Sequence, residues 1–175
     1  MTRRKILTAA AVIVGSVAVI GVGDRYGMFT DDESETLANV LKTKVSLPQA
    51  LTTSEQEGQP ISAKYEMEGG KLQLSVYTTK DGRFFEIIID PKTGTIAKVQ
   101  PIAEGEDLAH ARAQSAALTK AKTGLRDVVD HAMQDRGMRA VSVMPDMKGG
   151  RPVATVSVIM GGHGRQLKTI SAPMD

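Results

Sequence analysis

Two copies of one short pattern constrain the fold of this chain more than any other feature of its sequence. Residues 67–71 read MEGGK, and residues 147–151, 80 positions later, read MKGGR. On both sides of each Gly-Gly pair, apolar and polar residues alternate, which is typical of β-strands joined by a tight turn. Each copy therefore predicts an antiparallel hairpin. A period of this length indicates duplicated units rather than the short repeat of a solenoid.

The first half of the chain predicts helical segments followed by a four-stranded meander. Residues 37–45 carry one apolar stripe at helical spacing. Ser46 is a suitable N-cap for a second helix with Pro48 in its first turn, and this proline breaks or bends any helix that runs on to residue 56. Strands are expected at residues 61–68, 71–79, 83–90 and 95–99, and Asp81-Gly82 is a strong hairpin signal.

The second half repeats this plan. A long helix is expected at residues 107–136, bent or broken near Gly124, and strands are expected at 139–145, 152–160 and 165–171. We therefore predict an α+β fold of two helix-plus-antiparallel-sheet units, residues 30–104 and 105–175, after an N-terminal hydrophobic helix. A sheet of so few strands is marginal alone. Each unit is expected to need its helix, and also the other unit, to cover its sheet.

The first 29 residues are typical of a signal peptide or a membrane anchor. Arg3-Arg4-Lys5 precedes an uncharged run at residues 6–23, whose 18 residues are long for a signal peptide and just sufficient to cross a bilayer. The basic cluster is expected to stay in the cytoplasm, which places the body outside. We predict a periplasmic or otherwise extracytoplasmic body. It is anchored in the inner membrane through residues 6–23 if these are uncleaved, or secreted after cleavage. Residues 24–36 are polar and acidic and are interpreted as a linker.

Composition excludes several classes of function. The net charge is +2, but residues 1–29 hold four basic groups and one acid, so residues 30–175 carry 18 basic and 19 acidic side chains, a net of −1. A nearly neutral body gives no basic field for nucleic acid. The chain has no cysteine, which removes disulfides, thiolate nucleophiles and Cys-ligated zinc.

The stretch FEIIIDPKTGTI, residues 85–96, raises the question of a catalytic aspartate. Without Pro91 it reads Asp-Lys-Thr-Gly-Thr, which resembles the phosphorylated-aspartate motif of P-type ATPases. Phosphoryl transfer also needs a phosphate cradle and a Mg²⁺ site, and the sequence has no phosphate-binding loop. A turn accounts for every residue: Asp90 accepts bonds from the backbone ahead of it, Pro91 presets φ, and Gly94 takes a positive φ. We therefore interpret Asp90, Pro91 and Gly94 as a structural turn, and predict no catalytic residue.

The same stretch carries a family resemblance. Together with SLPQAL at residues 46–51 and the strand pattern from residue 61 to 99, FEIIIDPKTGTI resembles the PepSY domain. Residues 109–175 resemble a degenerate second copy, which lacks the terminal Asp-x-x-Thr-Gly. The resemblance implies a secreted or membrane-attached bacterial protein whose modules bind partners, in some cases inhibiting peptidases or sensing the surroundings. It implies no catalytic residue and no cofactor.

Histidine and methionine are the remaining candidates for metal chemistry. His110, His131 and His163 show no metal-ligand spacing and are interpreted as structural or solvent-facing. Six of the nine methionines follow residue 130, and Met144 and Met147 have the Met-x-x-Met spacing that Cu(I) ligands can use. The alternative is that methionine fills the core of a chain with few aromatics, here only three Tyr and three Phe. We predict no bound metal. A copper-responsive periplasmic accessory protein is the alternative function.

The best indication of function is the strand at residues 83–90, which is apolar on both faces. Such a strand is either covered on both sides or exposes a patch for a partner. Phe84 and Phe85 are therefore the candidate partner surface. We predict a non-catalytic PepSY-domain protein that binds or regulates an envelope protein, such as a peptidase or a membrane sensor.

Overall fold

The computed structural model describes residues 37–133, 137–160 and 166–175. The predicted anchor and linker and His163 lie outside these residues. Residues 37–41 are helical. The elements that follow are α2 (Leu47–Ser54), β1 (Gln59–Glu68), β2 (Lys71–Lys80), β3 (Arg83–Ile89), β4 (Ile96–Ile102), α3 (Gly105–Lys120), α4 (Leu125–Ala132), β5 (Met138–Lys148), β6 (Arg151–Met160) and β7 (Gln166–Pro173). The α+β class predicted from the sequence is confirmed.

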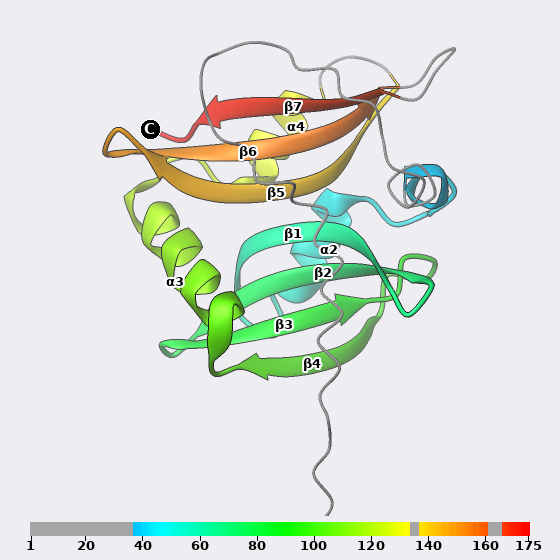
Figure 1. The fold of residues 1–175 in the computed structure, drawn as a ribbon, viewed down its shortest axis with the longest axis horizontal. Coiled ribbons are helices and arrows are strands. Elements are labelled where there is room, and N and C mark those ends of the chain that lie inside the picture. Colours follow the sequence, from blue (N-terminus) through cyan, green and yellow to red (C-terminus); the bar gives the residue numbers. More distant parts are fainter. Residues whose placement is uncertain (1–36, 134–136, 161–165) are drawn as a thin grey trace, which may run out of the picture.

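The strands form one antiparallel sheet of seven in the order β4-β3-β2-β1-β5-β6-β7 (Figure 1). Within each half, consecutive strands are neighbours, as expected for hairpins and meanders. Strands β1 and β5 meet in the middle, where the register joins Ala63 to Val143 and Lys64 to Ser142. These are two register pairs, against nine between β1 and β2, so each half is hydrogen-bonded mainly within itself.

Local sequence explains where α2 begins. The Ser46 N–H donates to Gln49 Oε1 over 2.7 Å, and the Gln49 N–H donates to Ser46 Oγ over 3.4 Å. This capping box satisfies backbone donors that have no partner inside the helix, and Pro48 occupies the first turn, where no N–H is needed. Leu47, Ala50 and Leu51 then point into the core.

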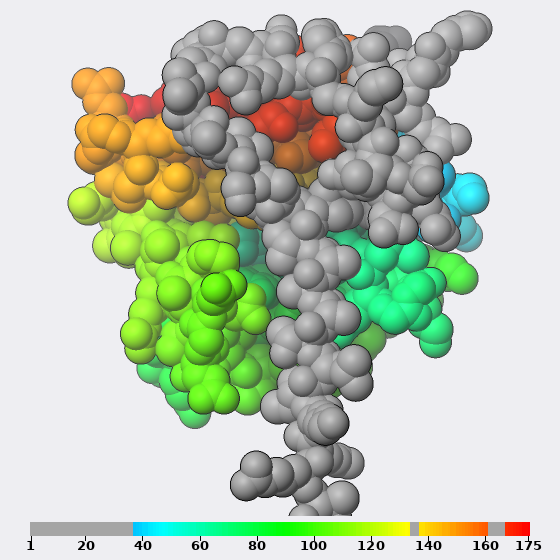
Figure 2. Space-filling view, viewed as in Figure 1, coloured from blue at the N-terminus to red at the C-terminus, as the bar shows by residue number. Residues whose placement is uncertain are grey.

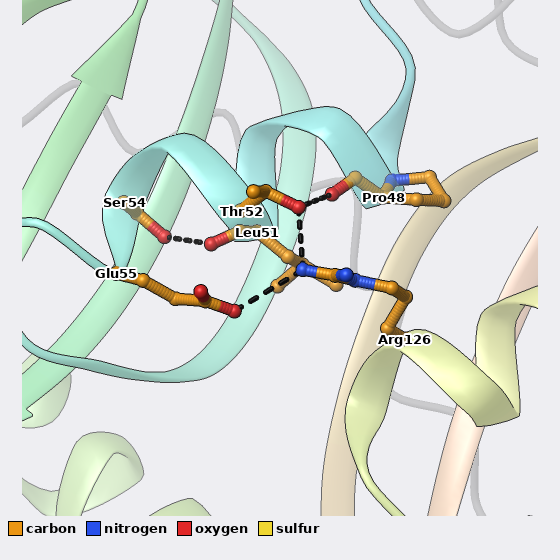
Figure 3. Close-up of polar contacts among 6 residues, drawn as sticks. All are labelled: Pro48, Leu51, Thr52, Ser54, Glu55 and Arg126. Carbon is orange, nitrogen blue, oxygen red and sulfur yellow. Dashed lines mark hydrogen bonds and ion pairs between the residues drawn. The ribbon is translucent and has the colours of Figure 1, made fainter.

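Two helices cover one face of the sheet. Helices α2 and α4 lie behind it in Figure 1, and side chains from both halves bury one continuous apolar cluster beneath them. Arg126 of α4 also reaches Thr52 of α2 and Glu55, which follows it, and the Nη2–Oε1 distance to Glu55 is 3.2 Å (Figure 3). The two helices therefore join the halves on this side.

Helix α3 packs along one end of the strands. Its Ala111 is fully buried against Ile61 and Tyr77, in a second cluster. Tyr77 lies between Val76 and Thr78 on β2, so its side chain is on the face opposite α2. The helix then reaches β5 and β6, and the space-filling view shows it directly against the second half (Figure 2).

The two Gly-Gly turns have nearly the same backbone. Gly69 and Gly70 have φ of +56° and +74°, and Gly149 and Gly150 have φ of +56° and +79°. Residues with a side chain rarely adopt such values, so glycine is required in both hairpins. The division into two domains at residues 30–104 and 105–175 stays a prediction.

Two expectations about arrangement need correction. The second half was expected to cover the sheet of the first, but it extends that sheet edge to edge through β1 and β5. The expected long helix is two helices, α3 and α4, because residues 121–124 leave the helical conformation, so His110 and His131 lie on different helices. The predicted break near Gly124 is confirmed.

Candidate partner-binding surface

The turn between β3 and β4 is built around Asp90. The backbone N–H groups of Lys92 and Thr93 donate to Asp90 Oδ1 over 2.8 and 3.0 Å. The Gly94 N–H donates to the Asp90 carbonyl over 2.9 Å, and Gly94 has a φ of +77°. These N–H groups lower the pKa of the Asp90 carboxyl below its ordinary value. The carboxylate is thus directed at its own turn.

This turn also holds the chain that leads into α2. The Val45 N–H donates to the Pro91 carbonyl over 3.3 Å. A Cβ on Gly94 would meet Val45 Cγ2 at 3.4 Å, so the turn and the entry to α2 are in close contact. Asp90, Pro91 and Gly94 therefore shape backbone in the structure.

A polar cluster lies on the face of the sheet opposite α2. Lys64 Nζ is 2.6 Å from Glu66 Oε2, and Gln73 Nε2 donates to Glu66 Oε1 over 3.1 Å. Ser75 Oγ donates to Glu86 Oε1 over 2.6 Å. These side chains alternate along β1, β2 and β3 with the residues of the main core, so the three strands present them together.

Helix α3 joins the cluster through Tyr77, whose hydroxyl donates to Asp107 Oδ1 over 2.9 Å. Burial, and next the hydrogen bond to Asp107, raise the pKa of the Tyr77 phenol well above its ordinary value. The phenol therefore stays protonated at physiological pH and acts as a donor. Burial also raises the pKa of the Glu86 carboxyl, while the Ser75 hydroxyl opposes that shift. The Tyr77 hydrogen bond ties β2 to α3.

Phe84 and Phe85 lie on opposite faces of β3. Phe84 packs against Ile61, Tyr77 and Ala111 in the cluster under α3. Phe85 packs against the main core and lies opposite Pro101 of β4. Both rings are half-buried. The two side chains therefore belong to different surfaces, and the partner surface at these residues stays a prediction.

Residues 44–100 match the family model described as Peptidase propeptide and YPEB domain, named PepSY. The chain contains a PepSY domain. No curated protein and no solved structure matches the chain. The matched residues begin just before α2 and end within β4, so the PepSY domain comprises α2, the β1–β4 half of the sheet and the Asp90 turn. This confirms the resemblance derived from residues 46–99.

Metal-ligating side chains do not converge in the described part of the molecule. Residues 37–133, 137–160 and 166–175 contain no group of three or more His, Asp or Glu side chains that could hold a metal ion. Met144 and Met147 both lie in strand β5, three positions apart. Because side chains alternate along a strand, the two thioethers lie on opposite faces and do not meet at one ion.

The polar cluster of the PepSY domain went unrecognised in the sequence. Its signal was present in part, because Lys64 and Glu66 alternate with Ala63 and Tyr65 along one strand. Glu86 gave no such signal, since it stands between Phe85 and Ile87 in a run that reads as apolar on both faces. Asp107 is on another element altogether, and only the packing of α3 brings it to Tyr77.

Proposed function

We propose that this protein is a non-catalytic, extracytoplasmic binding protein that regulates an envelope partner, such as a peptidase or a membrane sensor. The observation that carries the proposal is the PepSY match over residues 44–100, whose family description names peptidase propeptides. A propeptide acts by binding its peptidase, and binding needs a stable surface rather than a reactive group.

The geometry of the PepSY domain supports a binding role. Asp90 is the residue whose flanking sequence resembles a catalytic motif. Its carboxylate accepts hydrogen bonds from two backbone N–H groups of its own turn. Tyr77 and Glu86 have perturbed pKa values, which often mark functional sites. Burial is the largest cause of both raised pKa values, so structural packing accounts for them.

The extracytoplasmic location rests on the N-terminal sequence. Arg3-Arg4-Lys5 followed by the uncharged residues 6–23 supports export or anchoring, with the body outside the cytoplasm. None of the helices in the described residues is long and apolar enough to span a membrane. Residues 6–23 lie outside that part of the chain.

Crosslinked capture from membranes tests the proposal. The tagged full chain is expressed in its bacterial host, crosslinked in intact cells and purified in detergent, and the captured proteins are identified by mass spectrometry. An untagged excess of the same chain should compete for capture, which controls for nonspecific adhesion. We expect an extracytoplasmic peptidase or sensor among the competed proteins. Absence of any competed protein would contradict binding, and saturable turnover abolished by one side-chain change would contradict a non-catalytic role.

A further inference from the structure

Among the described residues, the sheet ends in two edge strands that differ in character. Strands β4 and β7 end the strand order, so each has backbone N–H and C=O groups directed away from the sheet. On β4, Val99 is 41% exposed, one of two large hydrophobic side chains exposed in the described residues. On β7, the described side chains that are exposed are Thr169, Ser171 and Pro173. A large aliphatic side chain, Val99, is thus exposed at the β4 edge, and none is exposed among the described residues of β7.

Val99 belongs to an apolar strip on the α2 side of the sheet. It lies directly opposite Ile87, and Pro101 lies opposite Phe85. The main contacts of helix α2 are with β1, β2 and β5, and β4 lies beyond them. On this face of β3, Ile87 and Ile89 are fully buried, but Phe85 is only half-buried, and Pro101 on β4 is exposed. The strip of Phe85, Val99 and Pro101 therefore continues to the open edge.

The other face of the same edge carries one exposed lysine. Lys98 lies opposite Ile88, one position from Val99, so its exposed side chain is on the α3 side. An added strand would place its side chains alternately beside the apolar strip and beside Lys98. Opposite charges on neighbouring strands attract and like charges repel. An acidic segment is therefore favoured over a second copy of β4, whose only charged side chain is another Lys98.

Pro101 limits how far such a strand can pair. It has no N–H, and proline is tolerated at an edge where its nitrogen faces away from the neighbouring strand. An added strand can therefore hydrogen-bond along β4 only up to this residue. The edge accepts a short extended segment rather than a long strand.

We propose that the β4 edge receives an extended segment of a partner protein, with acidic and apolar side chains in alternation, which adds to the sheet as an eighth strand. This inference rests on the proposed binding function and names its surface. The main-chain hydrogen bonds supply affinity, and the alternate side chains supply specificity through Val99 and Lys98.

A peptide of defined sequence tests the edge directly. The probe is a capped octapeptide of alternating Glu and Val, and the control probe has Lys in place of Glu. Each is titrated into the ¹⁵N-labelled full chain in detergent micelles, and amide shifts and hydrogen exchange are followed by NMR. We expect the Glu-Val probe to shift and protect residues 96–100, and the Lys-Val probe to bind about tenfold more weakly.

Three variants distinguish binding at the β4 edge from nonspecific effects of substitution. Val99→Asp should abolish the shifts, and Lys98→Glu should reverse the preference between the two probes. Thr169→Asp, on the opposite edge, should bind like the wild type and is the matched control. Equal binding of both probes, shifts outside β4, or equal losses in Thr169→Asp and Val99→Asp would overturn the proposal. Self-association of the wild-type chain that Val99→Asp abolishes would also overturn it, because the occupant would be a second copy.

Capture from membranes distinguishes a failure of this inference from a failure of the proposed binding function. If wild type captures no competed partner, the proposed binding function fails. If wild type and Val99→Asp capture the same partner equally, the binding function stands and the β4 edge is wrong. Loss of the partner in Val99→Asp but not in Thr169→Asp supports both.

Discussion

Arg139 at the start of β5 is expected to hold the second half of the molecule to the entry of the PepSY domain. Its Nη2 donates to Thr43 Oγ1 and, over 2.6 Å, to the Val45 carbonyl. No carboxylate forms an ion pair with it in the described residues, and its Nε is buried without a partner. The guanidinium thus acts through hydrogen bonds to neutral oxygens in a partly buried site.

Replacing Arg139 with Met keeps the apolar stem and removes these bonds. Hydrogen bonds from a charged donor contribute about 1.5–3 kcal/mol each. The loss is smaller here because neither acceptor is left alone: the Tyr65 hydroxyl still donates to the Val45 carbonyl, and the Thr43 hydroxyl still donates to the Val40 carbonyl. We therefore expect the free energy of unfolding to fall by about 1.5 kcal/mol.

Arg126 is the matched control, since it also joins the halves but at the surface. Its side chain is 46% exposed and that of its partner Glu55 is 56% exposed, so Arg126→Met should change stability by less than about 0.5 kcal/mol. Urea unfolding of the full chain, followed by circular dichroism, measures both variants. At an m-value of about 2 kcal/mol per M, Arg139→Met should lower the midpoint by about 0.7 M. An unchanged midpoint, or equal shifts in the two variants, would refute this account of Arg139.

Four further outcomes are expected. Because burial raises the pKa of Glu86 above its ordinary 4.5, ionising it disfavours the folded state, so the stability of wild type relative to Glu86→Gln should fall as pH rises through and above 4.5 in urea titrations. Ala117→Leu should lower stability by about 1–3 kcal/mol, because Ala117 is fully buried on the inner face of α3, whereas Ala113→Leu, at an exposed position of the same helix, should be nearly neutral. Asp90→Asn should lower the melting temperature only slightly, since an amide oxygen can still accept the turn's N–H groups, and phosphate labelling of wild type that this change removes would revive a catalytic aspartate. Residues 30–104 alone should melt well below the full chain, because the main apolar cluster includes both halves, and a cooperative melt at the full-length temperature would contradict this.

Periodicity was sufficient to predict most elements of the sheet and its turns. Alternation along residues 63–68 places Ala63 and Tyr65 on one face and Lys64 and Glu66 on the other, as the structure has them, whereas a bulge between Pro60 and Ser62 puts Ile61 on the opposite face from Ala63. Gly69 and Gly70, and the Asp-Gly pair at 81–82, mark the hairpin turns because few other residues adopt their backbone angles. These signals depend only on neighbouring residues, so they can be interpreted without knowledge of the rest of the fold.

The candidate site was harder to predict from the sequence, because it depends on which strands lie at the edge of the sheet. Phe84 and Phe85 are adjacent in sequence and appear equally apolar, yet they face different clusters once β3 is paired on both sides. Val99 reads as an ordinary strand valine, and its exposure follows from the position of β4 beyond the reach of α2. Neither fact is encoded in a window of neighbouring residues.

The sequence by itself determined the α+β class, the hairpins, the cap of α2, the Asp90 turn and the PepSY resemblance. Each follows from patterns among residues that are close together in the chain. Only the tertiary structure decided that the two halves share one sheet. The pairing of Ala63 with Val143 joins residues 80 positions apart, and no local pattern distinguishes that edge-to-edge contact from packing one sheet over the other. That choice leaves β4 as an open edge, and the proposed partner surface is a consequence of it.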